Sequence, residues 1–143
     1  MDSKAKIVIV DDHEMFREGM RLLIETEDIG EVIAEAENGQ KFLDLLENTV
    51  PDLVIMDIEM PVMGGLDATV KAIAIRSYLK ILVLTMQYQK EDCKDLIKAG
   101  VMGFVLKSAG KQELEKAIKT VIGGKKYFPE EQSCNIRIDL RKQ

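Results

Sequence analysis

The sequence predicts one doubly wound α/β domain, because five short apolar segments alternate with stretches of helical period along most of the chain. Four of these segments are near-continuous aliphatic runs, which is typical of strands covered on both faces of a parallel sheet. The chain has 143 residues, of which 46% are hydrophobic and 31% are charged. This length and composition suit a single globular domain with a buried core.

The expected strands are short and rich in β-branched or aliphatic side chains. They span Lys6–Val10, Glu31–Ala36, Leu53–Asp57, Lys80–Thr85 and Gly103–Leu106. Because a helical stretch separates each strand from the next, we expect parallel strands joined by right-handed crossovers.

Apolar side chains recur at helical spacing between the strands and predict five helices. Asn38-Gly39 precedes the second helix and fits an N-cap. The five apolar stripes are Phe16, Met20, Leu23 and Ile24; Phe42, Leu43 and Leu46; Leu66, Val70 and Ile73; Cys93, Leu96, Ile97 and Gly100; and Leu114, Ala117, Ile118 and Val121.

The strand–helix pattern stops after Gly123-Gly124. We therefore assign residues 1–124 to the folded domain and residues 125–143 to a linker or C-terminal tail. The tail contains Pro129, mixed charge and one weak alternation at Cys134, Ile136 and Ile138, and it is too short to form a second domain.

The net charge of −5 and the pI of about 5.0 disfavour direct binding of nucleic acid by this chain. No apolar run approaches the roughly 18 residues of a transmembrane helix, and the N-terminus has no apolar signal segment, so we expect a cytoplasmic protein without membrane contact. His13 is the only histidine and no CxxC spacing occurs, which argues against a multi-histidine or cysteine metal site.

The residues at the ends of the predicted strands carry the chemistry of the sequence. The first strand is followed by Asp11-Asp12, the third ends in Asp57, the fourth ends in Thr85 and the fifth is followed by Lys107. The carboxyl ends of the strands in an open α/β sheet meet at one crevice, where ligands bind. We therefore expect the three carboxylates, the hydroxyl and the ammonium to face the same crevice.

Carboxylates at such short range raise one another's pKa unless a cation neutralises them. Mg²⁺ suits that role, since it is usually held by one or two carboxylates together with water and phosphate oxygens. Lys107 adds a compact positive charge that suits a phosphoryl oxygen, and Thr85 adds a donor. These groups together support attack of Asp57 on a phosphorus atom, which gives an aspartyl phosphate.

Each of these signals is weak when taken alone. Asp11 or Asp12 could cap the next helix, and Asp57 could be a turn residue. Lys107 could be a solvated charge at a helix entry, and Thr85 a plain strand end. The functional interpretation depends on their conjunction, because all of them fall at the expected strand ends in the expected order.

The sequence resembles the receiver domain of two-component response regulators from about Lys4 to Gly124. The pieces that carry the resemblance are IVIVDDHEMFREGMRLLI, PDLVIMDIEMPVMGGLDA, ILVLTMQ and AGVMGFVLKSAGKQELEKAI. The resemblance implies a flavodoxin-like fold of five helices and five parallel strands in the order 2-1-3-4-5. It also implies a signalling domain whose only reactions are its own phosphorylation and autodephosphorylation, and not an enzyme acting on a separate substrate.

The same resemblance implies that Asp57 is the phosphorylation site and receives its phosphoryl group from a phosphohistidine on a sensor histidine kinase. Asp12 and Asp57 would bind Mg²⁺, and Asp11 would act largely through water. The backbone carbonyl of Glu59 would complete the protein ligands.

The resemblance further implies a switch. Lys107 would pair with the phosphoryl group and Thr85 would swing to hydrogen-bond it. Phe104 stands where the family places its switch aromatic, and its ring could enter the space that Thr85 vacates. The face made by the fourth helix, the fifth strand and the fifth helix would then change shape.

DDH, LTM and GFVLKSAG look like the NarL/FixJ branch, whose output domain is a LuxR-type helix-turn-helix, and Ser108 stands where many other receivers have proline. Three positions depart from the common pattern. Phe104 replaces tyrosine, so its switch must work through ring burial alone. Met86 is bulky after the threonine and is expected to narrow access to the acyl phosphate, whereas Glu59 adds an anion that is expected to influence dephosphorylation.

No helix-turn-helix follows the predicted receiver in this chain. The linker-like YFPEEQSCNIRIDLRKQ favours a receiver cut from a longer transcription factor over a free-standing one. The expected partners are a sensor histidine kinase and, on phosphorylation, either a second copy or an output domain. DNA would be contacted only through an output domain that this chain does not contain.

Three other functions fit the pattern less well. A haloacid-dehalogenase-type phosphatase needs its nucleophile on the first strand with a second acid two residues later, which Asp11-Asp12-His13 lacks. A flavodoxin-type cofactor binder needs a phosphate-cradling loop there, but Asp11, Asp12 and Glu14 would repel a phosphate. A pure interaction module would have no need of the complete acidic set.

Overall fold

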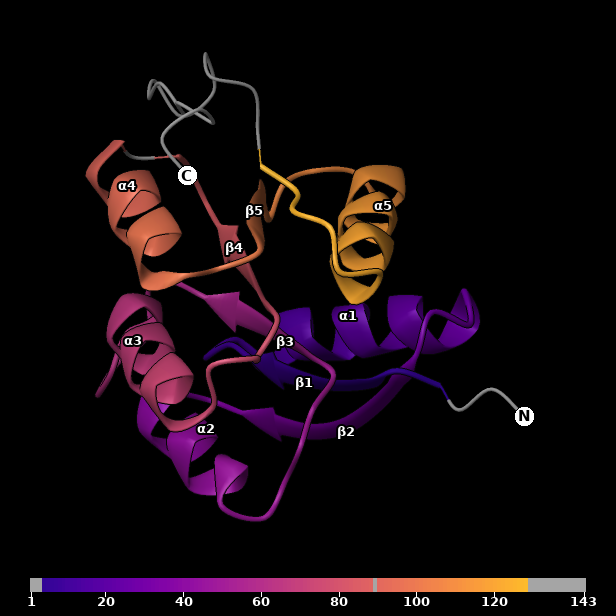
Figure 1. Ribbon diagram of the computed structural model, residues 1–143. Coiled ribbons are helices and arrows are strands. Elements are labelled where there is room, and N and C mark those ends of the chain that lie inside the picture. Colours follow the sequence, from indigo (N-terminus) through magenta and orange to yellow (C-terminus); the bar gives the residue numbers. More distant parts are fainter. Residues whose placement is uncertain (1–3, 89, 129–143) are drawn as a thin grey trace.

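A computed structural model describes residues 4–88 and 90–128, over which strands and helices alternate strictly. The elements are β1 (Lys6–Val10), α1 (Glu14–Thr26), β2 (Glu31–Ala36), α2 (Gly39–Leu46), β3 (Leu53–Asp57), α3 (Gly65–Ile75), β4 (Ile81–Thr85), α4 (Lys90–Ala99), β5 (Gly103–Leu106) and α5 (Lys111–Ile122). All strand pairs are parallel, in the order β2-β1-β3-β4-β5, so the predicted fold class is confirmed. Helices α1 and α5 cover one face of the sheet, and α2, α3 and α4 cover the other (Figure 1).

The core consists of two layers, because successive side chains of a strand point to opposite faces of the sheet. In β1, Ile7 and Ile9 are fully buried and pack with residues of α1 and α5. Val8 and Val10 alternate with them and join the cluster under α2, α3 and α4. The strands other than β2 are therefore apolar on both faces, which is why their sequences are continuous apolar runs, whereas the edge strand β2 carries Glu31 and Glu35.

The register of the sheet brings the polar strand ends together. Val10 of β1 pairs with Met56 of β3. Asp11 follows Val10 and Asp57 follows Met56, so the two aspartates lie side by side. Thr85 pairs with Leu106, the residue before Lys107, at the same edge of the sheet. The site is thus positioned by strand pairing and not by the loops alone.

The local predictions for the helices are confirmed at one point and wrong at another. Asn38 caps α2, since its Oδ1 accepts a hydrogen bond of 2.9 Å from the Lys41 amide. In the predicted apolar stripe of α3, Leu66 and Ile73 pack on the core, but Val70 is wrong, because it is 50% exposed. The buried face of α3 also presents Ala68 and Ala72, small residues on a helix that packs between α2 and α4.

The chain after α5 returns to the edge of the sheet (Figure 1). Tyr127 forms an isolated parallel bridge with Gly103 of β5, and Phe128 packs on the cluster under α2, α3 and α4. The domain boundary at residue 124 remains a prediction, but residues 127 and 128 contact the domain. The weak alternation at Cys134, Ile136 and Ile138 lies outside the described residues.

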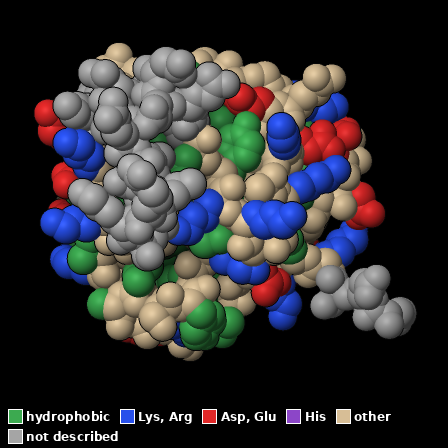
Figure 2. All heavy atoms as spheres, turned by 45° about the horizontal axis from the view of Figure 1, so that its top comes forward, with side chains coloured by type: hydrophobic (Ala, Val, Ile, Leu, Met, Phe, Trp, Pro, Cys, Tyr) green, Lys and Arg blue, Asp and Glu red, His purple; other side chains and the backbone are tan. Residues whose placement is uncertain are grey.

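The surface charge is uneven although the chain is acidic as a whole. Figure 2 shows lysine and arginine side chains gathered on one face of the molecule. Exposed lysines occur along and directly after α5, at Lys111, Lys116, Lys119, Lys125 and Lys126. None of the helices in the described part of the chain combines the length and the apolarity that crossing a membrane requires.

Candidate functional site

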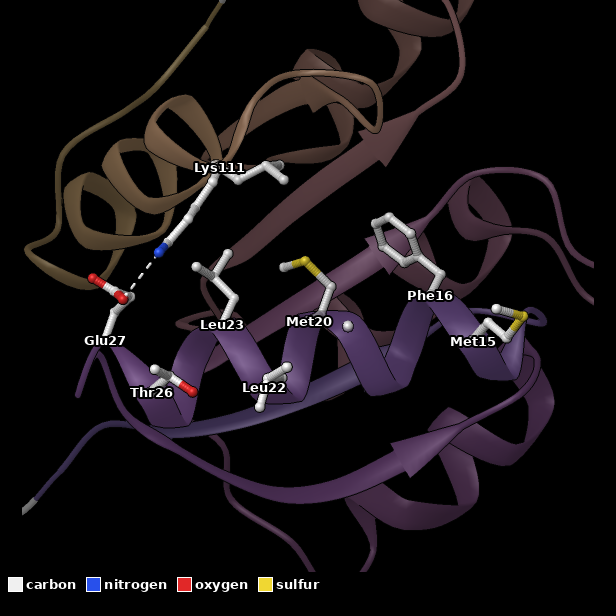
Figure 3. A pocket seen from close by; sticks show the side chains of 10 residues that line it. Met15, Phe16, Met20, Leu22, Leu23, Thr26, Glu27 and Lys111 are labelled. Carbon is white, nitrogen blue, oxygen red and sulfur yellow. Dashed lines mark ion pairs between the residues drawn. The ribbon is translucent and has the colours of Figure 1, made fainter.

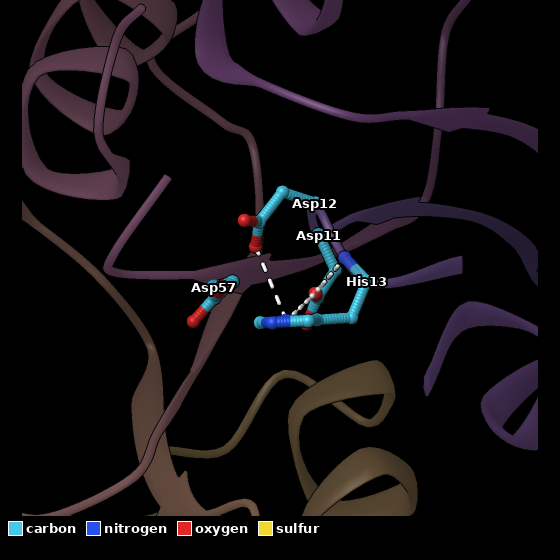
Figure 4. A group of neighbouring side chains, drawn as sticks. All are labelled: Asp11, Asp12, His13 and Asp57. Carbon is cyan, nitrogen blue, oxygen red and sulfur yellow. Dashed lines mark hydrogen bonds and ion pairs between the residues drawn. The ribbon is translucent and has the colours of Figure 1, made fainter. Parts of the chain in front are cut away.

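The predicted acidic residues form one cluster at the carboxyl edge of the sheet. Potential ligand atoms of Asp11, Asp12, His13 and Asp57 all lie within 4.8 Å of one another. Asp11 and Asp57 are almost fully buried, with 1% and 4% of their surface exposed, whereas Asp12 is half-buried. Figure 4 shows Asp11, Asp12 and His13 coming from one short segment and Asp57 facing them from the neighbouring strand.

Lys107 is the cation of the cluster. Its Nζ lies 2.6 Å from Asp11 Oδ2 and 3.4 Å from Asp57 Oδ2, and its side chain is only 8% exposed. The same ammonium lies 4.6 Å from the centroid of the Phe16 ring, within reach of a cation–π interaction. The sequence placed Lys107 in the crevice correctly, and the structure adds that Asp11 is its closer partner.

The Asp57 carboxyl group is strongly perturbed. Burial and the neighbouring Asp11 carboxylate raise the pKa of Asp57 to about 6, although Lys107 opposes the shift. An ordinary aspartate has a pKa of about 3.9. The repulsion between the carboxylates was expected from the sequence, whereas the larger cause of the raised pKa, burial, was not.

The cluster has oxygen atoms to offer a cation. Asp11 Oδ2 and Asp12 Oδ1 are buried, and neither accepts a hydrogen bond from the residues that the structure describes. Lys107 Nζ lies 2.6 Å from Asp11 Oδ2, and His13 Nδ1 lies 3.2 Å from Asp12 Oδ1. Carboxylate oxygens without hydrogen bonds are the donor type that Mg²⁺ prefers, so the residues present fit this ion.

Asp11 is held in place through its backbone. Its amide donates to the Ala36 carbonyl at 3.0 Å, which continues the pairing of β1 with β2. Its carbonyl accepts a bond of 2.5 Å from Arg17 Nη1, and Arg17 Nε donates to Glu35 at 2.9 Å. Helix α1 and strand β2 therefore fix the orientation of the acidic segment.

Thr85 and Phe104 lie beside the cluster in different environments. Thr85 Oγ1 donates to the backbone carbonyl of Gln87 at 2.8 Å. Phe104 is 1% exposed, and its ring packs at centroid distances of 5.9 Å from Tyr88 and 5.2 Å from Phe128. The Phe104 ring is thus already inside the protein, whereas the resemblance led us to expect burial as the event of the switch.

The loop between β3 and α3 closes tightly over Asp57. A Cβ built on Gly65 would stand 2.2 Å from the Asp57 carbonyl oxygen, and the Gly65 amide donates to Ile58 at 2.8 Å. Val62 has a φ of +68° in a turn that the Met63 amide closes onto Pro61 at 2.7 Å. Glu59, whose carbonyl was predicted as a metal ligand, follows Asp57 by two residues and has an exposed side chain.

Sequence reasoning missed several neighbours of the site. His13 was considered only as a lone histidine, but its Nδ1 lies 3.2 Å from carboxylate oxygens of both Asp11 and Asp12. Its position directly after the acidic pair could have signalled this proximity. Tyr88 and Phe128, the ring neighbours of Phe104, gave no signal, since neither belongs to a periodic segment.

A second hollow lies away from the acidic cluster, between α1 and α5. It has a volume of about 710 Å³ and is lined mainly by apolar side chains of α1, among them Phe16, Met20 and Leu23. Figure 3 shows these side chains pointing toward α5, with an ion pair of 3.1 Å between Lys111 and Glu27 at one end. This hollow offers apolar surface and no cluster of reactive groups, so the acidic cluster is the better candidate for chemistry.

Comparisons with known proteins agree with this geometry. A two-component response regulator of the LuxR family from Aurantimonas sp. SI85-9A1 has 34% sequence identity and a TM-score of 0.86, over 93% of this chain and 96% of that one. The transcriptional regulatory protein DegU of Brevibacillus brevis is 33% identical over 99% of this chain, and response regulator GacA of Pseudomonas aeruginosa is 36% identical over 86% of it. This chain spans only about 60% of the length of these two regulators.

The family description "Response regulator receiver domain" matches residues 7–119. That region contains all the elements from β1 to α5, except the first residue of β1 and the last turn of α5. The order of the strands and the acidic edge of the sheet are those that the resemblance implied. The chain belongs to the response regulator receiver domain family of two-component systems.

Proposed function

We propose that Asp57 is the phosphoryl acceptor of this receiver domain. The observation that carries the proposal is the position of its buried carboxylate, 3.4 Å from Lys107 and inside a cluster of three aspartates. In the proposed step an Asp57 oxygen attacks the phosphorus of a phosphohistidine on a sensor histidine kinase. A bond from that oxygen to phosphorus forms, the phosphorus–nitrogen bond breaks, and the imidazole keeps the electron pair and takes up a proton.

Asp11, Asp12, Asp57 and the backbone carbonyl of Glu59 are the proposed ligands of Mg²⁺. The hydrogen-bond-free oxygens of Asp11 and Asp12 support this assignment. Bound Mg²⁺ would supply positive charge next to the phosphoryl oxygens. Lys107 holds a second positive charge at the same place, and it keeps part of the Asp57 population ionised, as a nucleophile must be, because its ammonium lowers the Asp57 pKa.

The proposed switch starts from the bond between Thr85 and Gln87. A phosphoryl group adds a charge of about −1.5 to −2 and three strong acceptor oxygens beside Thr85. A hydrogen bond to a charged acceptor is stronger than one to a backbone carbonyl, so the hydroxyl gains by leaving Gln87. Lys107 and Phe104 are the other proposed members of the switch.

The partners follow from the family. We propose a sensor histidine kinase as the phosphoryl donor, a cytoplasmic location, and a response through a phosphorylation-promoted homodimer or through an output domain. DegU and GacA are named as a transcriptional regulatory protein and a response regulator. By analogy, contact with DNA would be made by an output domain and not by this acidic domain.

Intact mass after incubation with acetyl phosphate and Mg²⁺ tests the acceptor. Wild type should gain one phosphoryl group, and Asp57→Asn should gain none. Asp52→Asn is the matched control, because Asp52 stands at the opposite end of the same strand and should leave the gain unchanged. An unchanged mass for wild type, or a gain in Asp57→Asn, would overturn the assignment.

We also propose that the Glu59 side chain influences the lifetime of the phosphoryl group. Glu59 is exposed and lies two residues beyond Asp57, where it can order water or compete for the metal. A phosphate-release time course compares Glu59→Ala with wild type. Identical time courses would remove this part of the proposal.

A further inference from the structure

The edge of strand β5 is covered by the two residues Tyr127 and Phe128, which we call the β5 strap. The Phe104 amide donates to the Tyr127 carbonyl at 3.0 Å, and the Tyr127 amide donates to the Met102 carbonyl at 2.9 Å. An edge strand without such a partner would leave its amides and carbonyls unpaired. The strap therefore continues the sheet by one parallel bridge next to β5.

Gly103 and both core clusters of the domain accommodate the strap. A Cβ on Gly103 would stand 2.2 Å from the Tyr127 carbonyl oxygen, so only glycine lets the strap approach. Tyr127 packs on the cluster under α1 and α5, whereas Phe128 packs on the cluster under α2, α3 and α4. The two side chains thus straddle the sheet edge, as successive residues of a strand do.

A chain of direct contacts joins the strap to the proposed acceptor site. Thr85 Oγ1 holds the Gln87 carbonyl, and Gln87 precedes Tyr88. The ring of Tyr88 packs on the ring of Phe104, which also packs on the ring of Phe128. Thr85, Tyr88 and Phe104 also line one small, closely packed hollow, so a change at Thr85 is felt where the two rings meet.

We propose that the β5 edge with Phe104 is a docking surface for the strap, and that phosphorylation of Asp57 releases the strap from it. This inference rests on the proposed function. When Thr85 turns to the phosphoryl group, Gln87 loses its donor, and Tyr88 loses one of the contacts that hold its loop in place. Phe104 can then move away from Phe128, which weakens the strap.

In this mechanism, phosphorylation shifts an equilibrium between a docked and a released strap. It does not require a rigid mechanical connection from Asp57 to the strap. The strap is held by two backbone hydrogen bonds, the packing of Tyr127 under α1 and α5 and the contact of Phe128 with Phe104, so a change at Phe104 weakens one of its few supports. Segments held by so few contacts open locally without unfolding the domain.

Amide hydrogen exchange resolved by NMR tests the proposal at the two strap amides, Phe104 and Tyr127. Phosphorylated protein should exchange both amides at least about tenfold faster, while the Val54 amide, which bonds to Lys80 inside the sheet, should not change. Unchanged or slower exchange at the strap amides of protein that carries the phosphoryl group would overturn the inference.

A pair of variants tests the coupling without any phosphoryl group. Thr85→Val removes the hydroxyl that holds Gln87 and should speed exchange at the strap amides, whereas Thr85→Ser keeps the hydroxyl and should resemble wild type. Equal exchange in the two variants would contradict the coupling. If intact mass shows no phosphorylation, the proposed function fails, but this pair still decides whether Thr85 controls the strap.

A second pair tests the docking contact itself. Phe128→Ala removes the ring that packs on Phe104 and should open the strap. Tyr78→Ala deletes an aromatic side chain that is 68% exposed and should leave the strap amides unchanged. A Phe128→Ala protein with wild-type exchange at Phe104 and Tyr127 would show that the ring contact does not hold the strap.

Discussion

The backbone of Asp57 leaves no room for a side chain on Gly65. A Cβ there would stand 2.2 Å from the Asp57 carbonyl oxygen and 2.9 Å from the Ile58 Cα. Both neighbours are backbone atoms, at the end of β3 and in the residue that follows it, so they cannot turn aside as a flexible side chain would. Helix α3 begins at Gly65, and its approach to β3 therefore fixes the loop over the site.

Gly65→Ala should destabilise the domain by about 2–3 kcal/mol, the upper part of the range for overpacking. The strain should also displace Asp57, so the rate of phosphorylation by acetyl phosphate should fall. Urea denaturation and intact mass measure the two effects. Gly19→Ala is the control, because Gly19 lies exposed within α1 with no atom in the way, and there alanine should stabilise by about 0.5–1 kcal/mol. Equal effects of both substitutions would contradict the close approach.

Val62 holds a backbone conformation that a β-branched residue rarely adopts, with φ at +68°. Its side chain is 82% exposed, so replacing it removes little buried surface. Val62→Asn should raise the free energy of unfolding by about 1 kcal/mol, since asparagine tolerates positive φ. Val62→Ile retains the branched Cβ and should leave stability unchanged. A thermal melt in which the two variants coincide would show that the turn carries no strain.

The raised pKa of Asp57 predicts a pH dependence of stability in metal-free protein. Between about pH 4 and pH 6 the folded state keeps a proton on Asp57 that the unfolded state has lost, so the free energy of unfolding falls as the pH rises. The difference between pKa values of about 3.9 and about 6 corresponds to about 2–3 kcal/mol. This loss of stability is complete above about pH 6 and absent below about pH 4.

Asp57→Asn removes this titration and should be more stable than wild type by that amount at pH 7, but not at pH 4. Urea denaturation in EDTA at both pH values measures the difference. Mg²⁺ should reduce the gap at pH 7, because a cation relieves the same repulsion. A constant difference between the variants at both pH values would show that Asp57 titrates normally.

The sequence predicted the strands and the acidic cluster well for one physical reason. In a parallel sheet with buried faces, apolar runs mark the strands, and the pairing of Val10 with Met56 then places Asp11 beside Asp57. The face of α3 was not predictable in this way. The small residue Ala68 is buried on α3 between α2 and α4, whereas hydrophobicity alone favoured Val70, which is half exposed.

Contacts made by short irregular segments were also missed. Tyr127 and Phe128 occupy too few positions to show a period, and their docking depends on Gly103, a distant glycine. The bond from Thr85 to Gln87 depends on the course of the loop after β4, which no sequence pattern specified. The site residues could be predicted from the topology of the sheet. Their hydrogen-bond partners could be identified only in the three-dimensional structure.

Lys107 provides the last prediction, because its ammonium is nearly buried between two carboxylates. Lys107→Met should cost about 3 kcal/mol at pH 7 in EDTA, since Asp11 and Asp57 are left without their positive neighbour. Lys111→Met is the matched control. Lys111 also forms an ion pair, with Glu27 at 3.1 Å, but its side chain is 63% exposed, so its loss should cost less than about 1 kcal/mol.

A double-mutant cycle assigns the Lys107 effect to its closer partner. Asp11→Asn keeps the shape of the side chain and removes the charge, so Lys107→Met should cost less in that background. We expect a coupling energy of about 1–3 kcal/mol, as for charged groups in contact. Urea denaturation of the four proteins measures it. Simple additivity would mean that the 2.6 Å contact between Lys107 and Asp11 does not stabilise the fold, and that the lysine acts mainly through Asp57.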